Sequence, residues 1–402
     1  MLPLTGIKVV EVSMWAFVPS CGAVLSDWGA DVVKVEPPEG DPIRQLTMSG
    51  IPPGYKGLTF MWEIFNRGKR SLAIDLRADG AKEILYKLVE QADVFLVSLL
   101  VDSRKRLGID VDDILAIKPD IIYAAGSGQG AFGEEAGNGG YDAMTFWARG
   151  GISAALTPEG HHPISMPTGA FGDSLSGLAF AGGIAAAVAR QRATGEGGIV
   201  DGALLATAMW GMQAGIVGSS VLEVDTLPAM TRSSMPNVLV GSYRTKDGRF
   251  VALNMLQPDR YWPGFCEVAE RPDLIDHPRF GTFELRAEHL EETLAVMDEI
   301  FSQWTLAEWR ERLARQGGQW DVLKLMGELV TDPQAVANTY IQTVDYGDGR
   351  SLKMVPAPVQ FDRKVDPLRP APELGAHTDE VLLEAGFDEE QIIDAKVKGA
   401  VH

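Results

Sequence analysis

The chain has 402 residues, of which 46% are hydrophobic, and a formal net charge of −19 at pH 7. This composition is typical of a soluble globular protein, and the length predicts two or three domains. The acidic charge argues against a general nucleic-acid or anionic-membrane surface, because the field of the whole molecule would repel both. An anionic ligand would need a pocket with its own cations.

A β-α-β unit opens the chain. The patterns predict strands at Ile7–Val12 and Asp31–Glu36 on either side of a helix at Pro19–Trp28, which has Pro19 near its first turn and Gly29 after its end. A unit of about thirty residues favours a parallel sheet with a right-handed crossover. No basic and apolar leader precedes it, so we expect no signal peptide.

Strand and helix patterns then alternate, which predicts an α/β fold of the doubly wound type without specifying the strand order. The strands are expected at 71–76, 94–99 and 121–125, and the helices at 80–91 and 111–117.

The pattern changes near Leu227. A hairpin is predicted at Ser242–Leu253, with its turn at Asp247–Gly248, and helical patterns follow at 261–269, 290–301 and 306–316. We therefore expect a large domain over 1–227, a smaller α+β domain over 228–330 and a return segment over 331–402. The return segment is proline-rich, carries a last helix at Thr378–Ala385 and is expected to pack back on the first domain.

Asp173 stands between Gly172 and Ser174, where the run 178–188 of small apolar residues begins. That run predicts a helix packed closely on every side. It is too short and too rich in Ala and Gly to span a bilayer. The first interpretation of Asp173 is a helix N-cap.

The segment Gly126–Ala131 fits the dinucleotide pattern G-x-G-x-x-A after a strand. That fingerprint must open a helix, but here a glycine-rich stretch follows. We predict a flexible loop at the carboxyl ends of the strands, where such loops line ligand crevices.

Two cationic clusters, Arg67–Arg70 and Arg104–Arg106, are each either a solvated face or a phosphate site. Cys21 and Cys266 lie far apart, which favours a reducing cytoplasm. Neither CxxC nor HExxH occurs, so no metal site is predicted. The residues alone predict a soluble two-domain α/β protein with a candidate site for a phosphorylated ligand.

Motifs along nearly the whole chain resemble those of family III CoA-transferases, the group that includes formyl-CoA transferase, carnitine CoA-transferase and the α-methylacyl-CoA racemases. No one motif is decisive, but so many in one order are specific. They are Pro3–Val12, Trp28–Glu36, Asn66–Ser71, Ile74–Leu76, Arg106–Gly108, Gly140–Asp142, Gly172–Gly177, Thr194–Gly197 and Gly375–Val381.

The resemblance implies a Rossmann-like large domain built from both chain ends, a small domain, and two interlocked protomers. It implies a CoA-transferase acting on acyl-CoA and a carboxylic acid, without a permanently bound cofactor. Asp173 matches the family's nucleophile, which forms an anhydride and then an aspartyl-CoA thioester. Tyr141 and Asp142 are expected to support it. CoA contacts are expected, by the same resemblance, at Ala16, Phe17, Ile74, Arg77, Ser98, Leu99 and Arg106.

Departures from the family patterns narrow the activity. The racemases have Gly-His-Asp where this chain has Gly140-Tyr141-Asp142, and Glu-Pro where it has Gln257-Pro258. A tyrosine is a poor base at neutral pH, so a racemase or epimerase is the alternative, with a non-catalytic CoA-binding protein as a third hypothesis. Ser233–Val240 lacks the Gly-Gly-Gly of formyl-CoA transferases, which argues against oxalate and formate. Trp15, Phe17 and Trp62 hint at a bulky acid.

Overall fold

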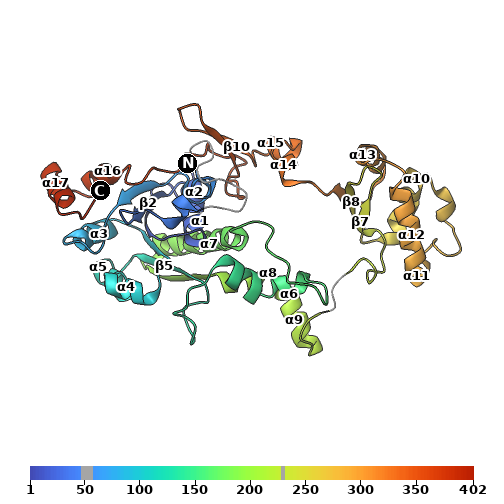
Figure 1. The fold of residues 1–402 in the computed structure, drawn as a ribbon, viewed down its shortest axis with the longest axis horizontal. Helices are drawn as coiled ribbons and strands as arrows, with labels where there is room; N and C mark the ends of the chain where they lie inside the picture. Colours follow the sequence, from blue (N-terminus) through green and yellow to red (C-terminus); the bar gives the residue numbers. More distant parts are fainter. Residues whose placement is uncertain (47–57, 228–230) are drawn as a thin grey trace. The chain divides into compact units, whose positions relative to one another are not determined.

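The computed structural model describes residues 1–46, 58–227 and 231–402. They form two compact units, whose elements are labelled in Figure 1. The larger unit comprises Met1–Leu227 together with Pro333–His402, and the smaller unit comprises Pro228–Asp332. The chain therefore leaves the larger unit once and returns to it, so both chain ends contribute to the same unit.

A six-stranded sheet forms the centre of the larger unit, in the order β3-β2-β1-β4-β5-β6. Every neighbouring pair is parallel, which confirms the α/β prediction. From β1 the chain builds outward through β2 and β3, then crosses to β4 on the other side. Ligands of open α/β sheets bind at the carboxyl ends of strands beside such a switch point. The strands are β1 (Lys8–Val12), β2 (Asp31–Glu36), β3 (Arg70–Ala73), β4 (Val94–Val97), β5 (Ile122–Ser127) and β6 (Gly198–Ala203).

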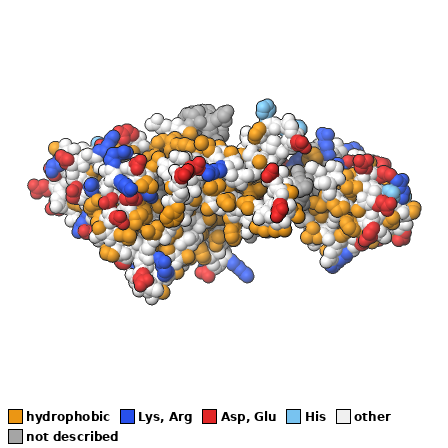
Figure 2. Space-filling view, turned by 90° about the horizontal axis from the view of Figure 1, so that it is seen from below, with side chains coloured by type: hydrophobic (Ala, Val, Ile, Leu, Met, Phe, Trp, Pro, Cys, Tyr) orange, Lys and Arg blue, Asp and Glu red, His pale blue; other side chains and the backbone are white. Residues whose placement is uncertain are grey.

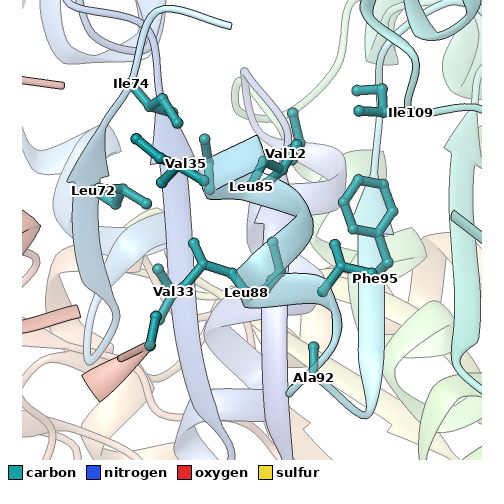
Figure 3. Close-up of a cluster of buried hydrophobic side chains, with 14 of the residues drawn as sticks. Val12, Val33, Val35, Leu72, Ile74, Leu85, Leu88, Ala92, Phe95 and Ile109 are labelled. Carbon is teal, nitrogen blue, oxygen red and sulfur yellow. The ribbon is translucent and has the colours of Figure 1, made fainter. Parts of the chain in front are cut away.

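Buried side chains on both faces of the sheet explain why its strands are continuous apolar runs. One face carries a core that includes Val33, Phe95 and Leu85, the last from a covering helix (Figure 3). The helices contributing to this core are α3 (Ala81–Val89), α5 (Val111–Ile117), α16 (Thr378–Glu384) and α17 (Glu389–Val397). The opposite face carries α1 (Phe17–Asp27), α7 (Phe171–Thr194) and α8 (Leu204–Gly211).

Helix α7 begins seven residues before the predicted apolar run and is buried on one face only. Phe180 and Ile184 pack in the core, whereas Leu175, Ala179 and Gly183 are exposed. The prediction of close packing on every side is therefore wrong for the single chain. By length and composition α7 could cross a membrane, as could the bent pair α8 and α9 (Gln213–Leu222). A core helix of a soluble protein also meets that test.

The C-terminal residues of the chain pair with the end of strand β3. The backbone N–H of His402 donates to the carbonyl of Ala73 at 3.0 Å, and Val401 forms a bridge with Ile74 just after β3. The helix predicted at Thr378–Ala385 is present as α16, but the prediction that it is the last helix is wrong, because α17 follows. Asp388 caps α17 by accepting from the backbone N–H of Gln391, a capping box that the sequence pattern contained.

The remaining elements of the larger unit are short. They are a 3-10 turn at Pro42–Gln45, α2 (Phe60–Asn66), α4 (Val101–Leu107), a π-helix at Asp142–Arg149, α6 (Ile152–Leu156), α15 (Pro333–Ala337) and the hairpin β10 (Gln342–Asp345) and β11 (Ser351–Met354).

The smaller unit is a three-stranded sheet with helices around its own core. The predicted hairpin is confirmed as β7 (Val240–Arg244) and β8 (Phe250–Asn254), with Gly248 in the left-handed conformation that its turn requires. Trp262, Phe301 and Trp309 fill the core. The other elements are β9 (Trp320–Val322), α10 (Pro258–Val268), a 3-10 turn at Pro272–Leu274, α11 (Phe283–Glu288), α12 (Leu290–Phe301), α13 (Leu306–Leu313) and α14 (Met326–Leu329).

Candidate active site

A cavity of about 400 Å³ lies in the larger unit at the carboxyl ends of β1, β4, β5 and β6. The segments after β1, β4 and β5 supply most of its lining, and Asp201 comes from β6. Apolar and aromatic side chains dominate it. Of the residues expected from the sequence, the cavity is lined by Ala16, Phe17, Ser98, Leu99, Tyr141 and Asp173.

Asp173 is the third residue of α7, within its first turn. Among the described residues, no donor makes a hydrogen bond to its carboxylate. Burial, and secondarily the charge of Asp142, raise the pKa of Asp173 to about 7. A carboxylate without donors, in a cavity and poised to ionise near neutral pH, is a strong nucleophile candidate.

Asp142 supplies the cap that the sequence assigned to Asp173. Its two carboxylate oxygens accept from the backbone N–H of Gly172 at 3.0 and 3.1 Å. The residue before the helix is Ala170, at φ 59°, and it offers no side-chain cap. The N-cap prediction for Asp173 is therefore wrong, because a carboxylate 30 residues upstream satisfies the helix start. Burial also raises the pKa of Asp142.

Gly172 permits this close packing. A Cβ at position 172 would lie 2.2 Å from Cγ of Phe146 and 2.4 Å from Oδ1 of Asp142. Both distances are far below van der Waals contact, so any side chain would push Asp142 or the start of α7 away. Gly172 thus allows the start of α7, which carries Asp173, to pack against Asp142 and Phe146.

The segment after β5 forms no helix before Asp142, as predicted, but the first two residues of Gly126–Ala131 belong to the end of β5 rather than to the loop. β5 ends at Ser127, and the next helical residues of the chain begin at Asp142. Several residues of this loop line the cavity, as predicted. Gly128 and Gly140 pack together there, since a Cβ on Gly128 would lie 2.5 Å from Cα of Gly140.

The cationic cluster Arg67–Arg70 is neither a solvated face nor a free phosphate site. Arg67 pairs with Asp27 at 2.7 Å, and Lys69 pairs with Glu11 at 2.8 Å in the core. Arg70 bridges three carboxylates on the surface of the sheet edge. Both readings of this cluster are wrong, because its charges are already neutralised within the protein.

The other expected cation positions lie outside the cavity lining. Arg106 is exposed, and its guanidinium donates to Oγ of Ser103 at 3.1 Å. Arg77 is exposed and pairs with Asp75 at 2.8 Å. Ile74, which was also expected to contact CoA, is not a cation and is buried in the core beneath α3 and α16. Trp62, one of the three aromatic residues considered for the acyl site, is buried in a cluster with Ala16 and Ala170 and is not part of the cavity lining.

Two charged residues that were not among the expected CoA contacts line the cavity, Arg104 and Asp201. Arg104 belongs to the cluster Arg104–Arg106, which the sequence predicted to be either a solvated face or a phosphate site. Arg104 lies two residues before the expected Arg106, is 13% exposed, and pairs through Nε with Asp110 at 3.2 Å. Asp201 was missed because β6 was not predicted as a strand. The apolar residues before it, followed by a carboxylate at a strand's carboxyl end, were the available signal.

A parallel α/β sheet with the carboxylate of Asp173, which has no hydrogen-bond donor among the described residues, in the cavity at its switch point is the arrangement of an enzyme with a carboxylate centre. The sequence profile of CoA-transferase family III matches residues 4–378. The chain belongs to this family and is a CoA-transferase.

Individual relatives agree with this assignment. The chain is 32% identical over 98% of both sequences to (R)-2-hydroxy-4-methylpentanoate CoA-transferase of Clostridioides difficile. It is 28% identical to cinnamoyl-CoA:phenyllactate CoA-transferase of Clostridium sporogenes, covering 96% of this chain and 94% of the relative. A crystal structure of a CAIB/BAIF family protein from Brucella suis superposes with a TM-score of 0.81 at 26% identity, covering 96% of this chain and 99% of that one.

Proposed function

We propose that the enzyme moves CoA from an acyl-CoA to a free carboxylic acid, with Asp173 as the nucleophile. The observation that carries the proposal is the Asp173 carboxylate itself, which lines the cavity without a donor among the described residues while Asp142 caps the helix. A structural cap needs those hydrogen bonds. A nucleophile is more reactive without them.

The proposed reaction has two symmetrical halves. The Asp173 carboxylate attacks the thioester carbonyl, the C–S bond breaks, and a mixed anhydride and CoA thiolate result. The thiolate attacks the aspartyl carbonyl, which releases the donor acid and leaves an aspartyl-CoA thioester. The acceptor carboxylate then attacks this thioester, and the thiolate released attacks the acyl carbonyl of the second anhydride. New acyl-CoA leaves and the Asp173 carboxylate is restored.

The first turn of α7 suits these charge movements. Negative charge forms on a carbonyl oxygen at each step, and backbone N–H groups and the dipole at a helix start stabilise such an oxygen. Each intermediate can be hydrolysed, so the apolar lining of the cavity supports the reaction by keeping water from the anhydride and the thioester.

We propose that the larger unit binds CoA and that the smaller unit is a separate small domain. Ala16, Phe17, Ser98 and Leu99 would contact CoA through backbone and shape, since they line the cavity. Arg106 and Arg77 would serve the distal nucleotide, outside the cavity, whereas Ile74 is buried in the core and would not contact it. Arg104 is the better-placed cation for the phosphates near the cavity, because this residue is part of the cavity lining.

We further propose an interlocked homodimer in the cytoplasm. Trp210, Val221 and Leu222 on α8 and α9 are 73%, 74% and 62% exposed in the single chain, and hydrophobic side chains are visible on that side of the larger unit (Figure 2). The open face of α7 adds small apolar residues. Surfaces of this kind are typical of permanent interfaces. Sedimentation should give a dimer that dilution does not dissociate.

Substitution of the nucleophile tests the proposed function. Asp173→Ala should abolish CoA exchange over a panel of donors and acids while still binding CoA. Asp201→Ala is the matched control, because it removes another carboxylate from the same cavity, and it should retain exchange. Wild-type turnover in Asp173→Ala would refute the mechanism. Deuterium uptake at the α-carbon without CoA exchange would favour the racemase instead.

A further inference from the structure

Trp15, which lines the cavity, has an unusual backbone conformation. Its φ is 69°, in the left-handed region that bulky residues rarely adopt. The backbone N–H of Trp15 donates to Oδ1 of Asp41 at 3.1 Å. Asp41 is 2% exposed and pairs through its other oxygen with the buried Lys34 at 3.0 Å. A buried ion pair therefore holds Trp15 in a conformation that it would not adopt by itself.

The indole of Trp15 meets the ring of Tyr141 edge to face, with ring centroids 5.9 Å apart and an interplanar angle of 87°. Both residues line the same cavity as Asp173. Tyr141 is 56% exposed, so this ring is not held there as part of the core. Trp15 and Tyr141 together form an aromatic wall of the cavity.

Two connections join the aromatic wall to the nucleophile. Asp142, next to Tyr141, accepts from the backbone N–H of Gly172, next to Asp173. Ala16, next to Trp15, packs in one cluster with Ala170, the residue before α7. Both rings are thus fixed relative to the first turn of α7. Strained backbone held by surrounding structure is concentrated at binding and catalytic sites.

The charges of the cavity oppose a second carboxylate on the substrate. Asp201 lines the cavity and would repel it. Arg104 is the one cation in the lining among the described residues, and it already pairs with Asp110. The phosphates of CoA would bind the remaining N–H donors of Arg104 more strongly than a second carboxylate on the substrate would.

We infer that the aromatic wall is the surface against which the acyl group packs, and that the enzyme selects monocarboxylic acids with a branched or aromatic side chain. Trp15 is then a specificity-determining residue. The inference rests on the proposed function, because it concerns the acyl group carried through the same site.

Identity exchange tests this directly. Each acyl-CoA is incubated with its own isotopically labelled acid, so donor and acceptor carry the same acyl group and CoA is constant. The probes are phenyllactate, propionate and succinate. The wild type should exchange phenyllactate with the highest kcat/KM. Trp15→Leu should lower that value about five- to tenfold, the size of a lost aromatic contact, and change propionate less than twofold.

Trp15→Phe is the matched variant, since Phe and Leu both keep a Cβ at the strained φ and only Phe keeps an aromatic ring. It should retain most of the phenyllactate exchange. Tyr141→Leu repeats the test if Trp15→Leu fails to fold. Equal losses for all three acids, or no loss with any, would overturn the inference and leave the proposed function standing. No exchange by the wild type with any acid would overturn both.

Discussion

Replacing Asp142 with Asn should shift the pH at which the enzyme becomes active. Asp173 must be ionised to attack, and its pKa is about 7, so kcat/KM should rise with pH and reach half its plateau near pH 7. Asp142→Asn removes the negative charge that opposes this ionisation. The Asn can still accept from the backbone N–H of Gly172, so the start of α7 is retained.

The structure bounds the size of the shift. The pKa of Asp173 lies about 3 pH units above its usual value of 3.8, and burial contributes more of that increase than Asp142 does. Removing the Asp142 charge should therefore lower the midpoint by less than about 1.5 pH units. At pH 5 the variant should be the faster enzyme, by up to about 25-fold, since more of its Asp173 is ionised.

The assay is kcat/KM for CoA exchange between pH 5 and 9 in the wild type and the variant. Ionisation of the substrate affects both enzymes equally, so the ratio of their kcat/KM values at each pH reports only the ionisation of groups in the protein. Asp201→Asn is the control: it removes a neighbouring charge that does not contribute to the pKa of Asp173, and its midpoint should match the wild type. An unmoved midpoint in Asp142→Asn, or one at higher pH, would refute the reasoning.

Three further outcomes follow from the same geometry. Asp173→Asn should raise the free energy of unfolding at pH 8 by up to about 4 kcal/mol. The pKa of Asp173 is raised in the folded state, so the wild type loses stability as pH rises from about 4 to 7, and the variant does not. In chemical denaturation, the gain should therefore vanish below about pH 4. Gly172→Ala should cost about 1–3 kcal/mol and most of the activity, since its Cβ meets Phe146 and Asp142; an active variant of normal stability would contradict this. Arg104→Gln should weaken CoA binding in calorimetry more than Arg77→Gln, because only Arg104 lines the cavity; equal effects would count against Arg104 as a phosphate contact.

Local patterns predicted most of the larger unit's sheet. β2 was placed to the residue, and the β1, β4 and β5 patterns were correct to within a few residues, because strands buried on both faces are continuous apolar runs. β6 was missed because its strand includes Gly198 and Gly202 and alternates partly exposed residues. The strand order could not be read, since it depends on contacts between distant segments.

Site residues could be predicted only where the residue type and its local motif indicate the chemistry. Asp173 was found, but its role as a cap was wrong because the true cap, Asp142, is distant in sequence and is joined to Gly172 only by the fold. The Arg67–Arg70 charges looked like a ligand site because their partners, such as Asp27 and Glu11, lie about 40 to 60 residues away. Charge neutralisation across a fold leaves no local pattern in the sequence.

The central claim is that Asp173 forms a covalent acyl and CoA intermediate. The most direct measurement is to incubate the enzyme with a productive acyl-CoA without acceptor, add hydroxylamine, and map the protein by mass spectrometry. The account predicts a hydroxamate on Asp173 that is absent from the Asp173→Ala variant and from enzyme without acyl-CoA. Unmodified Asp173 in enzyme that exchanges CoA with the same donor would contradict it.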